Sequence, residues 1–165
     1  MSRAGGGASH AKLSTAEPQD YAAIAAIWND VIRNTSLTFT TAEKTEADIA
    51  ALECVMVARI EAEVLAFAAY FPFRGGPGYA RTAEISIYVK PDRHGAGIGL
   101  ALLSALEGRA KESGKHVLIA GINTENANGR GFFERAGYQE MGTLSEVGHK
   151  NGRFLSLTLA QKTLR

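Results

Sequence analysis

The chain has 165 residues, of which 45% are hydrophobic, which is enough for the core of one domain. Its formal net charge is +1, so it lacks the basic surplus of a nucleic-acid-binding protein. We expect no membrane span, because the apolar stretch 55–73 is interrupted by Arg59, Glu61 and Glu63. The single cysteine, Cys54, can close no intramolecular disulfide, and no Cys/His spacing indicates a metal site.

The first residues are rich in Gly, Ala and Ser and lack the apolar segment typical of a signal peptide. We therefore expect a flexible leader over residues 1–10 and a single domain over 11–165. A reduced, cytoplasmic protein is the simplest interpretation.

Hydrophobic periodicity predicts alternating helices and strands. Pro18 is typical of a first helical turn, and Thr45 with Asp48 indicates the cap of a short helix. A strand, a helix and another strand follow one another over residues 84–120, and this order implies a parallel strand pair. The expected elements are helix 18–31, polar loop 34–39, short helix 45–52, strands 55–60, 64–71 and 84–89, helix 97–113, strand 116–120, helix 126–136, and strands 139–144 and 154–159 joined by a loop at 148–152.

The strand at 84–89 runs into a turn that contains Gly95, Gly97 and Gly99 and opens a helix. Glycine backbones can approach a ligand closely, and the free N–H groups of a first helical turn attract anions, so a phosphate or pyrophosphate is the expected guest. The spacing fits neither the P-loop nor the dinucleotide fingerprint. The alternative is a tight strand-to-helix connection that binds nothing.

Two charged residues are candidates for chemistry. Glu84, Ser86 and Tyr88 alternate with apolar residues and share one face of the predicted strand, so the Glu84 carboxylate is a candidate base; the alternative is an edge carboxylate in water. Arg74, in a Gly/Pro-rich loop, is either a solvated charge or a partner for a substrate carboxylate.

The run 84–89, followed by Pro91 and by Gly95 to Gly99, resembles motif A of the GCN5-related N-acetyltransferases, the GNAT superfamily. Residues 126–129 and 133–138 resemble its motif B. Residues 82–89 and 148–154 are similar to the branch that acetylates phosphinothricin and methionine sulfoximine. The resemblance implies an α/β GNAT fold: a mixed, mostly antiparallel sheet with a central splayed parallel strand pair, flanked by helices.

The resemblance implies direct transfer of acetyl from acetyl-CoA to the amine of a small amino-acid-like acceptor, such as methionine sulfoximine, methionine sulfone or phosphinothricin. The alternatives are acetylation of a protein N-terminus or lysine, and a non-catalytic acyl-CoA-binding module. Members of this branch form homodimers, so a homodimer is expected, with no metal, nucleic acid or membrane partner.

By resemblance, Glu84 is the catalytic base, and the main chain near Val89 stabilises the oxyanion. The implied cofactor contacts are Ile87, Tyr88, Val89 and Asn126 with the pantetheine arm, and Gly95, Ala96, Gly97, Ile98, Gly99 and Leu100 with the pyrophosphate. The implied acceptor contacts are Phe39, Arg74 and Tyr79.

The chain departs from the superfamily pattern at two site positions. His94 stands where motif A usually has Arg or Gln, so either His94 or Arg93 is expected to meet the pyrophosphate. Phe133 stands where motif B usually has Tyr or His, which leaves protonation of the departing thiolate to water or another group.

Overall fold

Seven strands form one sheet in the order β1-β2-β3-β4-β5-β7-β6. This computed structural model describes residues 10–95 and 97–165, so most of the predicted leader and Ala96 lie outside the described residues. The strands are β1 (Lys12–Thr15), β2 (Cys54–Ile60), β3 (Glu63–Pro72), β4 (Thr82–Val89), β5 (Val117–Asn123), β6 (Gln139–Lys150) and β7 (Arg153–Thr163). The helices are α1 (Tyr21–Asn34), α2 (Glu46–Ala50), α3 (Ile98–Glu112) and α4 (Ala127–Arg135), with short 3-10 turns at Pro18–Asp20, Pro77–Tyr79 and Pro91–Arg93.

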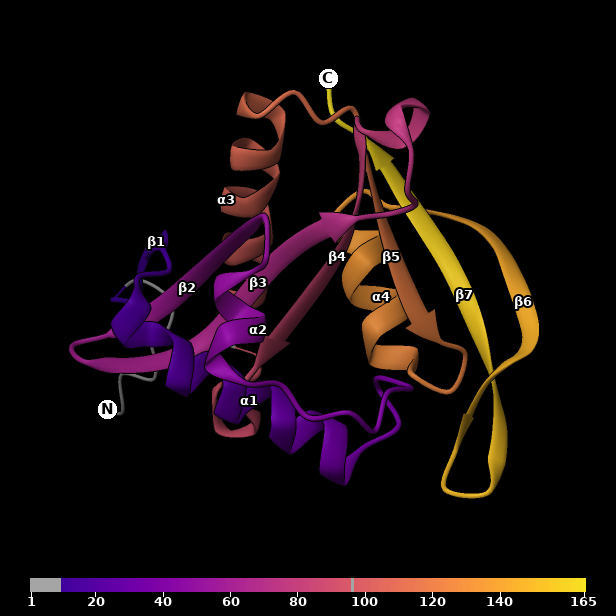
Figure 1. The fold of residues 1–165 in the computed structure, drawn as a ribbon, viewed down its shortest axis with the longest axis horizontal. Coiled ribbons are helices and arrows are strands. Elements are labelled where there is room, and N and C mark those ends of the chain that lie inside the picture. Colours follow the sequence, from indigo (N-terminus) through magenta and orange to yellow (C-terminus); the bar gives the residue numbers. More distant parts are fainter. Residues whose placement is uncertain (1–9, 96) are drawn as a thin grey trace, which may run out of the picture.

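Helices cover both faces of the sheet (Figure 1). On one face, α3 and α4 bury Leu102, Leu106 and Phe133 against the central strands. On the other face, α1 and α2 bury Trp28 against Phe67 and their neighbours. Because a strand sends alternate side chains to opposite faces, β3 and β4 contribute to both cores.

The parallel pair β4–β5 separates partway along its length. The two strands pair from Thr82 with Val117 to Ile85 with Ala120. Beyond these residues β4 pairs only with β3, and β5 pairs only with β7. Figure 1 shows the two strands diverging toward their C-terminal ends. The predicted mixed sheet with a splayed central pair is confirmed.

Local signals fix both ends of α3. Gly97 precedes its first residue with a φ of 78°, a left-handed conformation that favours glycine. Gly114, with a φ of 90°, follows its C-cap Ser113. The predicted start and end of this helix are therefore confirmed.

The predicted loop at 148–152 is wrong. Strand β6 continues to Lys150 and β7 begins at Arg153, which leaves a two-residue turn of Asn151 and Gly152. Both turn residues have positive φ, 53° and 73°, as the tightest hairpin turns require. The predicted strand 116–120 is also too short, because β5 continues to Asn123 along β7.

Within the described part of the chain, no helix combines the length and the apolar character needed to cross a bilayer.

Candidate active site

Glu84 lies on β4 just before that strand separates from β5. It shares a strand face with Tyr88, whose ring packs against Trp28 of α1. Gly121 of β5 lies beside the carboxylate, because a Cβ there would stand in van der Waals contact with Glu84 Oε1, at 3.5 Å. Burial raises the pKa of Glu84 and is the only cause of the shift, so no cation among the described residues holds this carboxylate in its charged form. A half-buried, unpaired carboxylate of this kind is suited to accept a proton near neutral pH.

The main chain of β4 offers unpaired groups beside Glu84. The amide of Lys90 donates to Leu65 O of β3 at 2.9 Å. The main-chain N–H and C=O groups of successive strand residues point alternately to the two neighbouring strands. The main-chain groups of Tyr88 therefore point to β3, like those of Lys90. Those of Ile87 and Val89 point to the side where β5 has separated. The main-chain amides of Ile87 and Val89 therefore point into the splay. The main chain of Tyr88 lies in the β3–β4 ladder, and burial raises the pKa of its hydroxyl to about 12.

His94 lies at the C-terminal end of β4, where the strands have already separated. Its Nε2 is 2.8 Å from Val89 O, and because a carbonyl oxygen only accepts, Nε2 donates this hydrogen bond. The guanidinium of Arg93 lies 3.7 Å from the Glu63 carboxylate. Both candidate residues for the pyrophosphate contact thus lie beside the glycine turn. The side chain of His94 contacts β4, and that of Arg93 contacts β3.

The residues predicted to meet the pyrophosphate lie in the glycine turn and the first turn of α3. Gly95 and Gly97 both have positive φ, 82° and 78°, and Gly97 leads into the first turn of α3. The side chain of Ile98 is buried and that of Leu100 is exposed. The groups that a first helical turn leaves available to an anion are its main-chain amides. A Cβ on Gly99 would lie 3.1 Å from Phe132, so glycine lets α3 approach α4 closely here. Ala96 lies outside the described residues.

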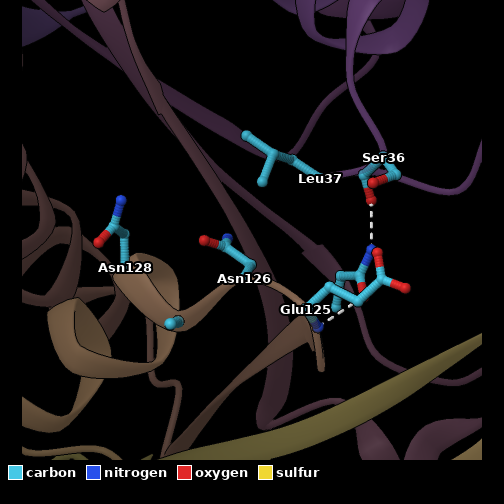
Figure 2. A pocket seen from close by; sticks show the side chains of 7 residues that line it. Ser36, Leu37, Glu125, Asn126 and Asn128 are labelled. Atoms are coloured by element: carbon cyan, nitrogen blue, oxygen red, sulfur yellow. Dashed lines mark hydrogen bonds between the residues drawn. The ribbon is translucent and has the colours of Figure 1, made fainter.

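A pocket of about 300 Å³ opens between the α1–α2 loop and the start of α4. Figure 2 shows Ser36 and Leu37 on one side and Asn126 and Asn128 on the other. Asn126 caps α4, because its Oδ1 accepts from the Gly129 amide at 2.9 Å. The predicted pantetheine residue therefore lines the pocket and also stabilises the helix start.

The predicted acceptor residues form two groups. The Phe39 ring packs directly on Gly148 of β6, where a Cβ would stand 2.2 Å from the ring. Arg74 and Tyr79 are exposed in the β3–β4 loop, with the guanidinium carbon 5.3 Å from the tyrosine ring centre. This loop follows Pro72, the last residue of β3, and the neighbouring Phe71 pairs with Glu84. Arg74 is therefore near the Glu84 end of β4, and Phe39 is held by β6.

Two buried polar residues at the site were not predicted. Asn123, at the end of β5, is 1% exposed and donates from Nδ2 to Ser36 O at 2.8 Å. Lys150 is 4% exposed and donates to three carbonyl oxygens of the α1–α2 region. A polar residue that ends an apolar strand is a usable signal for Asn123, whereas no local pattern marks Lys150.

Phe133 packs edge-on against Phe132 and Tyr138, with ring centres 5.1 and 5.2 Å apart. It has no proton to donate, and the Tyr138 hydroxyl donates to Glu107 at 3.2 Å. Residues 10–95 and 97–165 contain no group of three His, Cys, Asp or Glu side chains that could hold a metal ion.

Known proteins of similar sequence and structure indicate the family of the chain. Residues 21–138 match the acetyltransferase (GNAT) family. The chain is 35% identical to an L-methionine sulfoximine/L-methionine sulfone acetyltransferase of Pseudomonas paraeruginosa, over 93% of this chain and 95% of that protein. A phosphinothricin acetyltransferase from Sinorhizobium meliloti, solved with acetyl-CoA, matches with a TM-score of 0.86 at 29% identity, over 94% of this chain and 89% of that one. A ribosomal-protein-alanine N-acetyltransferase from Brucella melitensis matches with a TM-score of 0.86 at 35% identity, over 93% and 99% of the two chains.

Proposed function

The chain belongs to the GNAT family of acetyl-CoA-dependent N-acetyltransferases, and we propose that its acceptor is the α-amine of a small amino-acid-like molecule. The acceptor class is that of methionine sulfoximine, methionine sulfone and phosphinothricin, which the names of the relatives support. The observation that carries the catalytic part of the proposal is the unpaired carboxylate of Glu84, beside the point where β4 and β5 separate.

Glu84 is the base in this proposal. An amine is mostly protonated at neutral pH, so it must lose a proton before it can attack a thioester. A carboxylate whose pKa is raised by burial can take that proton directly or through a water molecule. In this proposal Arg74, in the loop that follows β3, binds the carboxylate of the same acceptor.

The main chain of β4 and the glycine turn hold acetyl-CoA in this proposal. Acetyl-CoA supplies the activated acetyl group as a thioester. A free amide of β4, that of Ile87 or of Val89, donates to the thioester oxygen as negative charge develops on it. The first-turn amides of α3, with Gly95, Ala96 and Gly97, bind the pyrophosphate, where the helix dipole favours negative charge. The thiolate that leaves is protonated by water, because Phe133 cannot donate a proton.

The test is acetyl-CoA turnover over a panel of amino-acid acceptors. The wild type should acetylate at least one member of the methionine sulfoximine class. Glu84→Gln, which keeps the size of the side chain but cannot accept the proton, should lower kcat by a factor of about 10²–10⁴. Glu112→Gln, which removes an exposed carboxylate at the end of α3, is the matched control. Equal turnover by the wild type and Glu84→Gln would reject the assignment of the base.

Acetylation of a protein N-terminus is the second candidate, and the Brucella melitensis relative is the observation that favours it. The panel therefore includes a peptide with an N-terminal alanine. A higher kcat/KM for this peptide than for every free amino acid would replace the proposed acceptor class.

We also propose a homodimer formed through the β6–β7 hairpin. Large apolar side chains are exposed along this hairpin, and clusters of this kind mark contact surfaces. They are Met141, Leu144, Val147 and Phe154. In sedimentation velocity the wild type should run at twice its chain mass, and Val147→Asp combined with Phe154→Asp should run as a monomer. A monomeric wild type would reject this part of the proposal.

A further inference from the structure

The ammonium group of Lys150 joins β6 to the end of α1. Its Nζ donates to Ile32 O at 2.7 Å, to Thr35 O at 2.7 Å and to Thr38 O at 2.9 Å. These three carbonyls belong to the last turn of α1, its C-cap and the loop that follows. One side chain therefore fixes three points of a segment more than a hundred residues away in sequence.

This placement satisfies groups that the helix leaves unpaired. The last carbonyls of an α-helix have no partner within the helix, and its C-terminus favours a positive charge. Here Val31 O accepts from both the amide and the hydroxyl of Thr35, and the chain then leaves the helix. Lys150 supplies the donor that a further helical turn would have given to Ile32 O.

The hydrogen bonds require the charged form of Lys150. Burial lowers the pKa of its ammonium from the usual 10.5. However, three carbonyl acceptors at hydrogen-bond distance need three N–H donors, and only the ammonium has three. A neutral amine that could serve as a second base is therefore excluded by this geometry, and the contribution of Lys150 is to hold the segment.

The segment it holds is residues 35–39, which we name the acceptor loop. Ser36 and Leu37 of this loop line the pocket (Figure 2). Ser36 O is bound by Asn123 of β5, and the ring of Phe39 rests on Gly148 of β6. Asn123 of β5 and residues 148 and 150 of β6 thus hold the loop, and Lys150 makes two of its hydrogen bonds, at Thr35 O and Thr38 O.

We propose that Lys150 is a positioning residue for the acceptor, which sets the wall of the acceptor pocket by clamping the carbonyls of Ile32, Thr35 and Thr38. This inference rests on the proposed function, because it takes the acceptor loop as part of the acceptor site. None of the three hydrogen bonds of Lys150 reaches the glycine turn, which binds the pyrophosphate in the proposed function. A change at Lys150 should therefore act on the acceptor more than on coenzyme A.

The experiment compares Lys150→Met, Lys150→Arg and the control Lys12→Met, which removes an exposed lysine of β1. The acceptor is whichever amine the wild type acetylates in the panel, so the failure of the proposed acceptor class leaves this test intact. For Lys150→Met, kcat/KM for the acceptor should fall by about a hundredfold, mainly through KM, because a displaced wall misplaces the amine. The dissociation constant of coenzyme A should stay at its wild-type value, and Lys150→Arg, which keeps the charge and several donors, should recover part of the loss.

Hydrogen exchange gives a readout independent of substrate. Amides of residues 35–39 should exchange faster in Lys150→Met than in the wild type and Lys12→Met. If Lys150→Met does not fold, NMR of the 15N-lysine-labelled wild type replaces it, and one ammonium should show slowed hydrogen exchange that is lost in Lys150→Arg. An unchanged acceptor KM, an equal loss of coenzyme A affinity, or no protected ammonium in the wild type would overturn the proposal.

Discussion

The contact between Phe39 and Gly148 gives the sharpest test of the acceptor loop. A Cβ built on Gly148 would stand 2.2 Å from Phe39 Cδ2 and 2.8 Å from its Cγ, far inside contact distance. Cγ is the ring atom nearest the main chain of Phe39, so rotation of the ring cannot relieve this overlap. Gly148→Ala therefore forces the ring, and with it the acceptor loop, away from β6.

Gly142, on the same strand, is the matched control, because a Cβ there would meet nothing within 4 Å. Either substitution lowers the conformational entropy of the unfolded chain, which stabilises a protein by about 0.4–1 kcal/mol. This term is common to both variants and cancels in their difference. Only Gly148→Ala adds the cost of overpacking, about 1–3 kcal/mol. We therefore expect Gly148→Ala to be less stable than Gly142→Ala by that amount.

Thermal unfolding measures this difference, since each kcal/mol shifts Tm by about 2–4 °C in a chain of this size. The kcat/KM for the acceptor should fall in Gly148→Ala and remain at the wild-type value in Gly142→Ala. Equal Tm values and equal kcat/KM for the two variants would show that the ring does not rest on Gly148, and the reasoning about the loop would fail.

Four further predictions concern three side chains: Glu84, Asn126 and Tyr88. Because burial raises the pKa of Glu84, kcat/KM of the wild type should fall as pH drops through that pKa, and Glu84→Gln should lack this limb in a pH-rate profile. The same shift means that the folded chain binds the proton of Glu84 more tightly than the unfolded chain does. The free energy of unfolding should therefore fall as pH rises from 4.5 through the raised pKa of Glu84. Denaturant titrations of Glu84→Gln should lack this contribution to the slope. Asn126→Ala removes the cap of α4 and should lower the free energy of unfolding by about 1 kcal/mol, with Asn126→Ser keeping most of it. Tyr88→Phe should have the pH-rate profile of the wild type around neutral pH, because burial raises the pKa of the Tyr88 hydroxyl to about 12 and the hydroxyl stays neutral there.

Local signals explain why much of the fold could be predicted. The ends of α3 follow from Gly97 and Gly114, because glycine, which has no Cβ, readily adopts the positive φ that both positions have. The parallel β4–β5 pair follows from the strand-helix-strand order. The Glu84 face follows from alternation along one strand. Each of these inferences uses either residues that are close in sequence or the rule that a strand-helix-strand crossover joins parallel strands.

The rest depends on contacts between distant parts of the chain. Lys150 is buried against the α1 carbonyls, although hydropathy favours an exposed lysine. The hairpin turn is shorter than predicted because Gly148, typical of a loop, is a strand residue that makes room for Phe39. An Asn-Gly pair at 151 and 152 is a local signal for the tighter turn, and it agrees with the structure.

The spacing along β4 also indicates where acetyl transfer takes place. Glu84 lies just before the strands separate, and the free amides of β4 belong to Ile87 and Val89. A strand rises about 3.3 Å per residue, so the Cα atoms of these two residues lie roughly 10 and 16 Å from that of Glu84. A glutamate side chain, one water molecule and the amine span the shorter distance, whereas the longer one needs a chain of waters. We therefore infer that the thioester oxygen is bound nearer Ile87, with the pantetheine arm continuing past Val89 toward the glycine turn at the start of α3.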